Sequence, residues 1–212
     1  MTAVAISRLH FPVTTLGPGK RVGIWFQGCS IRCAGCISID TWPSGRGIID
    51  LDRVLDVLMP WLAGADGITI SGGEPFDQPE ALHQLLVRLR SLTRVTTLVY
   101  SGYSFEKLAS WLEHHSGLID ALISDPYEHS VPQTMALRGS DNQRLHLLTP
   151  AGTTAFSCFN RTATADDRRL DAMFNADGSV WFAGVPARGD LVRLREALTG
   201  AGHNISISEG SS

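Results

Sequence analysis

Three cysteines stand close together and form the most reactive group of side chains in the sequence. They are Cys29, Cys33 and Cys36, in the spacing C-x3-C-x2-C. Thiolates are soft ligands, and several of them this close together usually hold one metal centre. Three ligands are one short of a closed four-coordinate site, and an open position is typical of catalytic rather than structural metals. The spacing therefore predicts an iron–sulfur cluster with one iron free to bind a substrate or cofactor.

Other chemistry is compatible with the same cysteines. Cys33-Ala34-Gly35-Cys36 alone would suit a thioredoxin-like redox pair, but Cys29 lies outside that motif. A zinc site would need a fourth ligand, and the nearest histidine, His10, lies nineteen residues upstream. A disulfide scaffold fits least, because the chain has 4 cysteines in 212 residues and we expect no signal peptide before them. The fourth cysteine, Cys158, is expected to be an isolated thiol.

The composition is that of an ordinary globular protein. Of the 212 residues, 43% are apolar and 18% are charged, which suits a single domain over residues 1–212. The apolar runs are too short to span a bilayer, and a net charge of −3 gives no general attraction to nucleic acid. Clustered thiols that must stay reduced favour the cytoplasm. We therefore expect neither a membrane nor nucleic acid among the partners.

The elements that must position the cysteines alternate between strand-like and helical patterns. Strands are expected at Arg21–Gln27, Gly67–Ser71, Thr96–Ser101, Asp120–Ser124 and Arg144–Leu148. Helices are expected over Leu51–Leu62 and starting at Pro79, at Ser104 and near Asp190. The alternation predicts an α/β fold, a partial and open parallel β/α barrel of about five to six units.

The C-terminal part of the sequence is expected to depart from this alternation. Leu170–Phe174 and Val180–Ala183 flank Asn175-Ala176-Asp177-Gly178 and predict a β-hairpin. The final helix is expected to bury Leu191, Leu194 and Leu198. Before the hairpin, Thr149–Asp167 is rich in threonine, alanine and glycine and is expected to be an irregular loop.

Glycine-rich and polar motifs follow the predicted strands where these end. They are the cysteine loop, Ser71–Pro75, Ser101–Tyr103, Ser124–Pro126 and Gly184–Pro186. In parallel α/β folds, ligands bind beyond the carboxyl ends of the strands. We therefore expect these five loops to converge on one face that also carries the metal.

Two motifs are candidates for ligand contacts. Gly72 and Gly73 let the backbone approach a ligand closely, and Glu74 can accept a hydrogen bond from an amine. An ordinary strand-to-helix turn would use the same residues. In Arg138-Gly139-Ser140-Asp141-Asn142-Gln143, the arginine can clamp a carboxylate, and the serine and asparagine can bond ribose or backbone groups. A solvated turn is the alternative there.

The cysteine spacing followed by Ser71-Gly72-Gly73-Glu74-Pro75 resembles the radical S-adenosylmethionine (SAM) superfamily. More narrowly, the chain resembles the activating proteins of anaerobic ribonucleotide reductase, small relatives of pyruvate formate-lyase activase. The motifs that carry this resemblance are Gly28–Cys36, Trp42, Ser101–Tyr103, Arg138–Gln143 and Gly184–Pro186. Many superfamily members have an aromatic residue where this chain has Gly35. The activating proteins of anaerobic ribonucleotide reductase resemble this chain at that position, so the difference favours that subfamily.

The resemblance implies a cofactor set and a role for each matched residue. The three cysteines would hold a [4Fe–4S] cluster, and SAM would bind its open iron. The residues that contact SAM would be Gly72, Gly73, Glu74, Ser101, Arg138, Ser140, Asn142 and Val185. The first three would hold its amino group, the polar side chains its ribose or carboxylate, and Val185 its adenine. The cluster would cleave SAM reductively to a 5′-deoxyadenosyl radical, with no catalytic side chain beyond the cluster and SAM.

Three functions are compatible with this reading. The first is a glycyl-radical activase, an oxidoreductase that abstracts hydrogen from a much larger protein through an open rim formed by 43–47, 124–133 and 149–167. The second is a free-standing radical SAM enzyme that acts on a small molecule or peptide in a biosynthetic pathway, with 149–167 as a lid. Either would need a low-potential electron donor such as flavodoxin or ferredoxin. The third is a cluster-binding electron-transfer or sensor protein, against which Gly72-Gly73-Glu74 argues.

Overall fold

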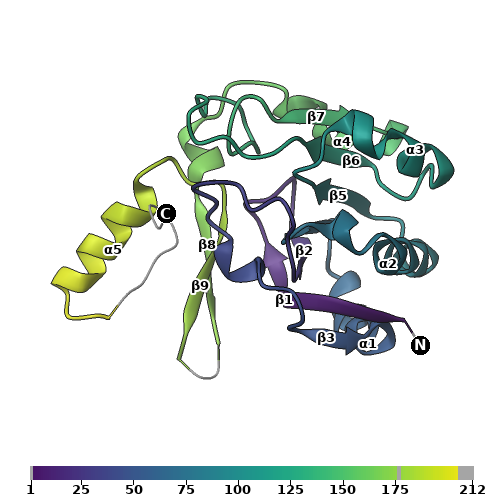
Figure 1. Cartoon of the computed structure of the whole chain (residues 1–212), viewed down its shortest axis with the longest axis horizontal. Helices are drawn as coiled ribbons and strands as arrows, with labels where there is room; N and C mark the ends of the chain where they lie inside the picture. Colours follow the sequence, from purple (N-terminus) through teal and green to yellow (C-terminus); the bar gives the residue numbers. More distant parts are fainter. Residues whose placement is uncertain (1, 176–177, 205–212) are drawn as a thin grey trace.

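The computed structural model describes residues 2–175 and 178–204, and its centre is a seven-stranded sheet (Figure 1). The strands are β1 (Ala3–Val13), β2 (Arg21–Phe26), β3 (Ile48–Asp50), β4 (Gly67–Gly72), β5 (Thr96–Tyr100), β6 (Ala121–Ser124) and β7 (Arg144–Leu147). Their order in the sheet is β3-β1-β2-β4-β5-β6-β7. Strands β2, β4, β5 and β6 are parallel, and β1, β3 and β7 are antiparallel to the strands beside them.

The sheet is mixed and open, so the expected parallel barrel of five to six units is not confirmed. The parallel part contains four strands. The strand predicted at Arg144–Leu148 is present as β7, but it pairs antiparallel with β6, with Ser124 opposite Arg144. A parallel return needs a crossover, usually a helix. The connection between β6 and β7 contains none, so the chain turns back along the sheet edge.

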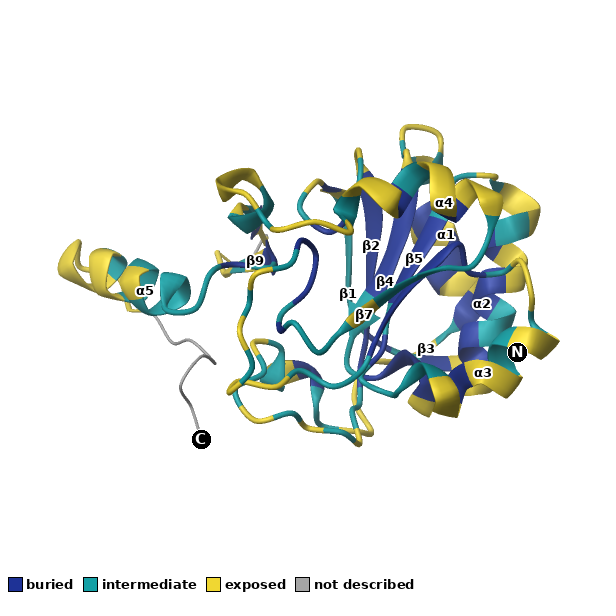
Figure 2. Ribbon diagram, turned by 90° about the horizontal axis from the view of Figure 1, so that it is seen from above, coloured by how far each residue is buried: buried dark blue, intermediate teal, exposed yellow. Residues whose placement is uncertain are grey.

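Helices α1 (Leu51–Leu62), α2 (Pro79–Leu92) and α3 (Phe105–His114) cover one face of the sheet. Their starts follow the predicted local signals. Asp50 accepts a hydrogen bond from the Asp52 amide, Ser104 accepts one from the Lys107 amide, and Pro79 opens α2. Figure 2 shows buried residues concentrated on the central strands and on the sides of these helices that face them.

Helix α4 (Pro150–Phe156) lies against β5, β6 and β7, within the segment expected to be an irregular loop. Thr149 caps it by accepting a hydrogen bond from the Gly152 amide, and Phe156 is fully buried. Threonine and glycine are weak helix formers, so packing rather than propensity stabilises this helix. Four short 3-10 turns are η1 (Ile39–Thr41), η2 (Pro75–Asp77), η3 (Ser157–Phe159) and η4 (Ala165–Arg168).

The expected hairpin is formed by β8 (Leu170–Phe174) and β9 (Val180–Gly184). Residues 176 and 177 of its turn lie outside the described residues. Met173 and Ala183 are buried against Val13, Leu16 and Trp25, which fixes the hairpin beside β1 and β2.

Helix α5 (Asp190–Gly200) forms as predicted, but it contains no buried residue. The expectation that Leu191, Leu194 and Leu198 are buried is therefore wrong. Figure 1 shows α5 beyond the hairpin and away from the sheet. Among the helices that the structure describes, none is long and apolar enough to cross a membrane.

Candidate functional site

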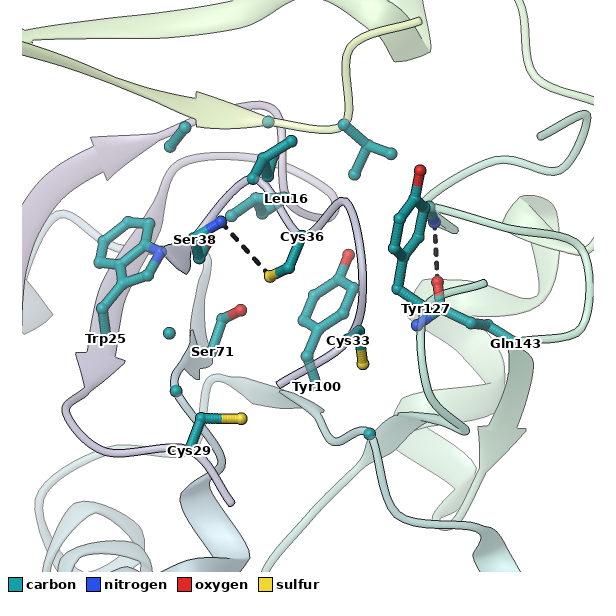
Figure 3. Close-up of a pocket in the computed structure, with 18 of the residues that line it drawn as sticks. Leu16, Trp25, Cys29, Cys33, Cys36, Ser38, Ser71, Tyr100, Tyr127 and Gln143 are labelled. Carbon is teal, nitrogen blue, oxygen red and sulfur yellow. Dashed lines mark hydrogen bonds between the residues drawn. The ribbon is translucent and has the colours of Figure 1, made fainter. Parts of the chain in front are cut away.

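A cavity of about 220 Å³ brings together the loops that follow β2, β4, β5 and β9 (Figure 3). Its lining includes the three clustered cysteines, Ser71–Glu74, Tyr100–Gly102 and Gly184–Pro186. The chain after β6 contributes Tyr127 rather than the expected Ser124–Pro126. The loops after β2, β4 and β5 therefore meet at the carboxyl ends of parallel strands, as predicted, and the end of the hairpin joins them. The predicted contribution of Ser124–Pro126 is not found in the lining.

Cys29, Cys33 and Cys36 are half-buried free thiols that line this one cavity. In Figure 3 they stand around a hollow with Ser71 and Tyr100 nearby. Within the described residues, no three histidine, cysteine or acidic side chains are arranged to hold a single metal ion. Three thiols spread around a cavity suit a cluster of several irons better than one ion.

The cysteine loop is held by close contact between backbones. The Gly28 amide donates to the Thr41 carbonyl at 2.7 Å, and the Glu74 amide donates to the Gly28 carbonyl at 2.9 Å. A Cβ atom on Gly73 would lie 2.0 Å from the carbonyl oxygen of Gly28. Position 73 must therefore be glycine because the cysteine loop packs against its backbone. From the sequence alone, we expected this glycine to allow the approach of a ligand.

Cys33 and Cys36 lie in surroundings that disfavour the thiolate until a metal is present. Burial raises the pKa of Cys33 and of Cys36 above the usual value for a thiol. Two hydrogen bonds act in the opposite direction at Cys36, from the Ser38 amide at 3.4 Å and from the side chain of Trp42. Because bound metal cations favour thiolates strongly, this donor set fits an iron cluster that deprotonates its ligands.

Glu74 is buried at the edge of the same cavity and joins two loops. Its Oε1 accepts hydrogen bonds from the Phe76 amide at 3.0 Å and the Ser101 hydroxyl at 2.9 Å, and its Oε2 accepts one from the Gly102 amide at 2.8 Å. Burial nevertheless raises the pKa of Glu74 to about 7. A carboxylate has roughly four acceptor positions, so Oε2 keeps one for a ligand amine.

The other predicted SAM contacts divide into two groups. Val185 lines the cavity, and Ser101 lines it while also holding Glu74. The lining does not include Arg138, Ser140 or Asn142. These three side chains bond instead to Asn160 Oδ1, the Glu128 amide and the Pro126 carbonyl, respectively. Their contact with SAM stays a prediction. From the same loop, Gly139 and Gln143 line the cavity.

The side chains that complete the cavity but were not predicted from the sequence include Leu16, Tyr100 and Arg188. Tyr127 and Gln133 come from the predicted rim segment 124–133, and Gln143 comes from the Arg138–Gln143 motif. Tyr100 ends β5 and directly precedes the motif that begins at Ser101. This position in the sequence could have predicted that Tyr100 lines the cavity. The segment 149–167, expected as a rim or lid, contributes no residue to the lining.

Comparison with known proteins agrees with this geometry. Residues 15–146 match the family model described as a 4Fe-4S single cluster domain. The chain is 30% identical over 136 residues to the anaerobic ribonucleoside-triphosphate reductase-activating protein of Enterobacteria phage T4, and the match covers 61% of this chain and 85% of that protein. The chain belongs to this family of radical SAM activating proteins. It is an enzyme, and its cofactors are a [4Fe–4S] cluster and SAM.

This radical SAM activating protein also resembles longer relatives. It is 33% identical over 103 residues to the pyruvate formate-lyase-activating enzyme of Clostridium pasteurianum, a match that covers 46% of this chain and 43% of that enzyme. It is 32% identical over 120 residues to the enzyme of the same name from Staphylococcus aureus (strain USA300), covering 50% and 47%, respectively. The chain therefore spans less than half the length of these two relatives.

Proposed function

We propose that this radical SAM activating protein generates a radical on a glycine of a larger partner protein. The [4Fe–4S] cluster would supply one electron to cleave SAM into methionine and a 5′-deoxyadenosyl radical, which removes the glycine hydrogen. The observation that carries the proposal is the cavity in which three free thiols meet Gly72, Gly73 and Glu74. The relative of which this chain covers 85% is itself named for activating a reductase.

The residues that line the cavity have different roles. Cys29, Cys33 and Cys36 hold the cluster. The unoccupied acceptor position on Glu74 Oε2 takes the amino group of SAM, and the bonds from Ser101 and Gly102 keep that carboxylate in place. Val185 provides an apolar wall for the adenine. The protein thus positions both cofactors and excludes water without a further acid or base.

The alternative substrate, a small molecule or peptide of a biosynthetic pathway, would use the same cofactors. Its expected lid was the segment 149–167, and this segment forms α4 against β5–β7 rather than lining the cavity. No observation favours that function. Both functions need a low-potential electron donor such as flavodoxin or ferredoxin, and we assign the reaction to the cytoplasm, where thiols stay reduced.

An anaerobic assay tests the proposal directly. The enzyme reconstituted with iron and sulfide is incubated with SAM and dithionite, and 5′-deoxyadenosine is quantified. A candidate glycyl-radical protein is then added and its radical is followed by electron paramagnetic resonance (EPR). We expect both products, and we expect neither from Cys33→Ala. Without 5′-deoxyadenosine the radical SAM reaction is wrong, whereas 5′-deoxyadenosine without a glycyl radical contradicts the activase.

Cys158→Ala is the matched control for the cysteine variants. Cys158 is exposed and lies outside the lining of the cavity. We expect this variant to keep its iron content and both products.

A further inference from the structure

A second cavity, here called the outer cavity, shares a wall with the first. Its volume is about 470 Å³. Cys29 and Trp42 line both cavities, so a cluster ligand and an indole ring form the partition between them. The rest of the outer cavity comes from the start of β1, the cysteine loop, the loop before β3 and the turn before α2, through Ala3–Ala5, Gln27, Gly28, Ser30, Arg32, Ser44, Gly45, Ile48, Asp77 and Gln78.

A backbone hydrogen bond holds the two residues of the partition together. The carbonyl of Trp42 accepts a hydrogen bond from the Cys29 amide at 3.1 Å. Both Trp42 and Cys36 line the first cavity. A residue at the outer cavity thus contacts a proposed cluster ligand directly, and the first cavity is left for SAM.

We propose that the outer cavity is the docking site of the electron donor, a small electron-transfer protein with an acidic surface. This inference rests on the proposed function. SAM fills the first cavity before its cleavage, so the electron must arrive from another direction, and the outer cavity reaches the ligand Cys29 from there. One electron leaves the reduced prosthetic group of the donor and reduces the cluster across the Cys29–Trp42 partition. The donor is oxidised by one electron, and no bond is made or broken.

Two arginines give the outer cavity its preference for an acidic partner. Arg32 lines it, and Arg46 is exposed in the loop that supplies Ser44 and Gly45 to its wall. Neither arginine forms an ion pair with any other residue that the structure describes. The Arg32 side chain only donates to the Cys29 carbonyl, at 3.3 Å. Unpaired cations of this kind steer an oppositely charged protein to its site.

The nearby carboxylates are already engaged. Asp40 pairs with Arg8, and Asp77 accepts hydrogen bonds from Ser30 and Tyr103. Neutral donors leave the charge of Asp77 in place, so the net positive charge of this face comes from two unpaired arginines, Arg32 and Arg46, against one carboxylate.

The test compares two reductants on the reconstituted enzyme. Cluster reduction is followed in a stopped-flow spectrophotometer with fully reduced flavodoxin, an acidic flavoprotein, or with dithionite. At low ionic strength we expect Arg46→Glu and Arg32→Glu to slow reduction by flavodoxin about tenfold and to leave reduction by dithionite unchanged. Calorimetric binding of oxidised flavodoxin should weaken in parallel, and added salt should slow the unmodified enzyme more than the variants.

Arg94→Glu is the matched control, since Arg94 is also exposed but precedes β5 at the opposite end of the strands. Flavodoxin rates and binding equal to those of the unmodified enzyme in both test variants would overturn the docking site. Slower reduction by dithionite as well would show that the arginines support the cysteine loop, and would also overturn it. Formation of 5′-deoxyadenosine with dithionite tests the proposed function separately, because that assay needs no protein donor.

Discussion

The carboxylate of Asp77 accepts a hydrogen bond from the Tyr103 hydroxyl at 2.6 Å. The same carboxylate accepts bonds from the amide and the hydroxyl of Ser30, at 2.7 and 2.9 Å. Ser30 follows the ligand Cys29, Asp77 ends the turn after Gly72-Gly73-Glu74, and Tyr103 ends the loop after β5. One side chain therefore ties together the three loops that form the proposed cluster and SAM sites.

Asp77→Asn should loosen this connection. An amide nitrogen cannot accept hydrogen bonds, so at least one of the three bonds is lost, which costs ~1 kcal/mol and raises the Kd for SAM about fivefold. The measurement is a titration of SAM into the reduced enzyme, followed by EPR. Asp52→Asn, which removes only an exposed ion pair with Arg88, is the control and should leave the affinity unchanged. Equal affinities in the two variants would contradict a positioning role for Asp77.

Gly73→Ala should impair the cluster as well as SAM binding. The added Cβ would meet the carbonyl of Gly28, next to Cys29, at 2.0 Å. Forcing apart packed backbones costs about 1–3 kcal/mol. We expect less iron per chain after reconstitution, measured by a colorimetric iron assay. Gly200→Ala is the control, because a Cβ there has no neighbour within 4 Å. Full iron content in Gly73→Ala would show that the loops can separate without cost.

Trp42→Phe should lower the reduction potential of the cluster. The change removes the indole N–H, whose donation lowers the pKa of Cys36, but keeps an aromatic ring at the partition. Hydrogen bonds to cluster sulfurs stabilise the reduced state, so losing one makes reduction harder. A redox titration followed by EPR measures the midpoint potential. Trp25→Phe changes an indole of the same cavity, and we expect it to leave the potential near its original value. If the midpoint potential of Trp42→Phe equalled that of the unmodified enzyme, Trp42 would have no effect on the reduction potential of the cluster.

Glu74 should make the folded chain less stable as the pH rises from about 4.5 to about 7. Its pKa is raised from 4.5 in the unfolded reference to about 7 by burial, so the folded state holds the extra proton in that interval. Stability falls with pH wherever the folded state binds more protons, and the loss is complete above pH 7. The free energy of unfolding of the cluster-free chain, measured in urea from pH 5 to 8, should fall by a few kcal/mol relative to Glu74→Gln. If the free energy of unfolding changed equally with pH in the unmodified chain and in Glu74→Gln, the prediction would be wrong, and the Glu74 carboxylate would not be desolvated.

Local signals in the sequence predicted much of this structure. The caps at Asp50 and Ser104 act within one helical turn, and the helices begin there. The cysteine spacing is likewise a local pattern. The direction of β7 depends on its pairing with β6 across a long connection, which no local pattern reports. Strand β1 was not predicted, although its partner β2 is the next strand in the chain. The side chain of Arg138 turns to Asn160, a contact that spans 22 positions, and so its absence from the cavity lining could not be read from its own motif.

The walls of the cavity are firmly packed, and the helix that follows one of them is not. The wall with the cysteines and Glu74 is anchored to β2, β4 and β5, whose residues are largely buried. The opposite wall, Gly184–Pro186, leads into α5, which buries no residue. Few buried contacts mean low local stability, so amide hydrogens of α5 should exchange with solvent well before those of β2. The segment Gly184–Pro186 is itself largely buried, so amide exchange should distinguish this fixed wall from the helix that follows it.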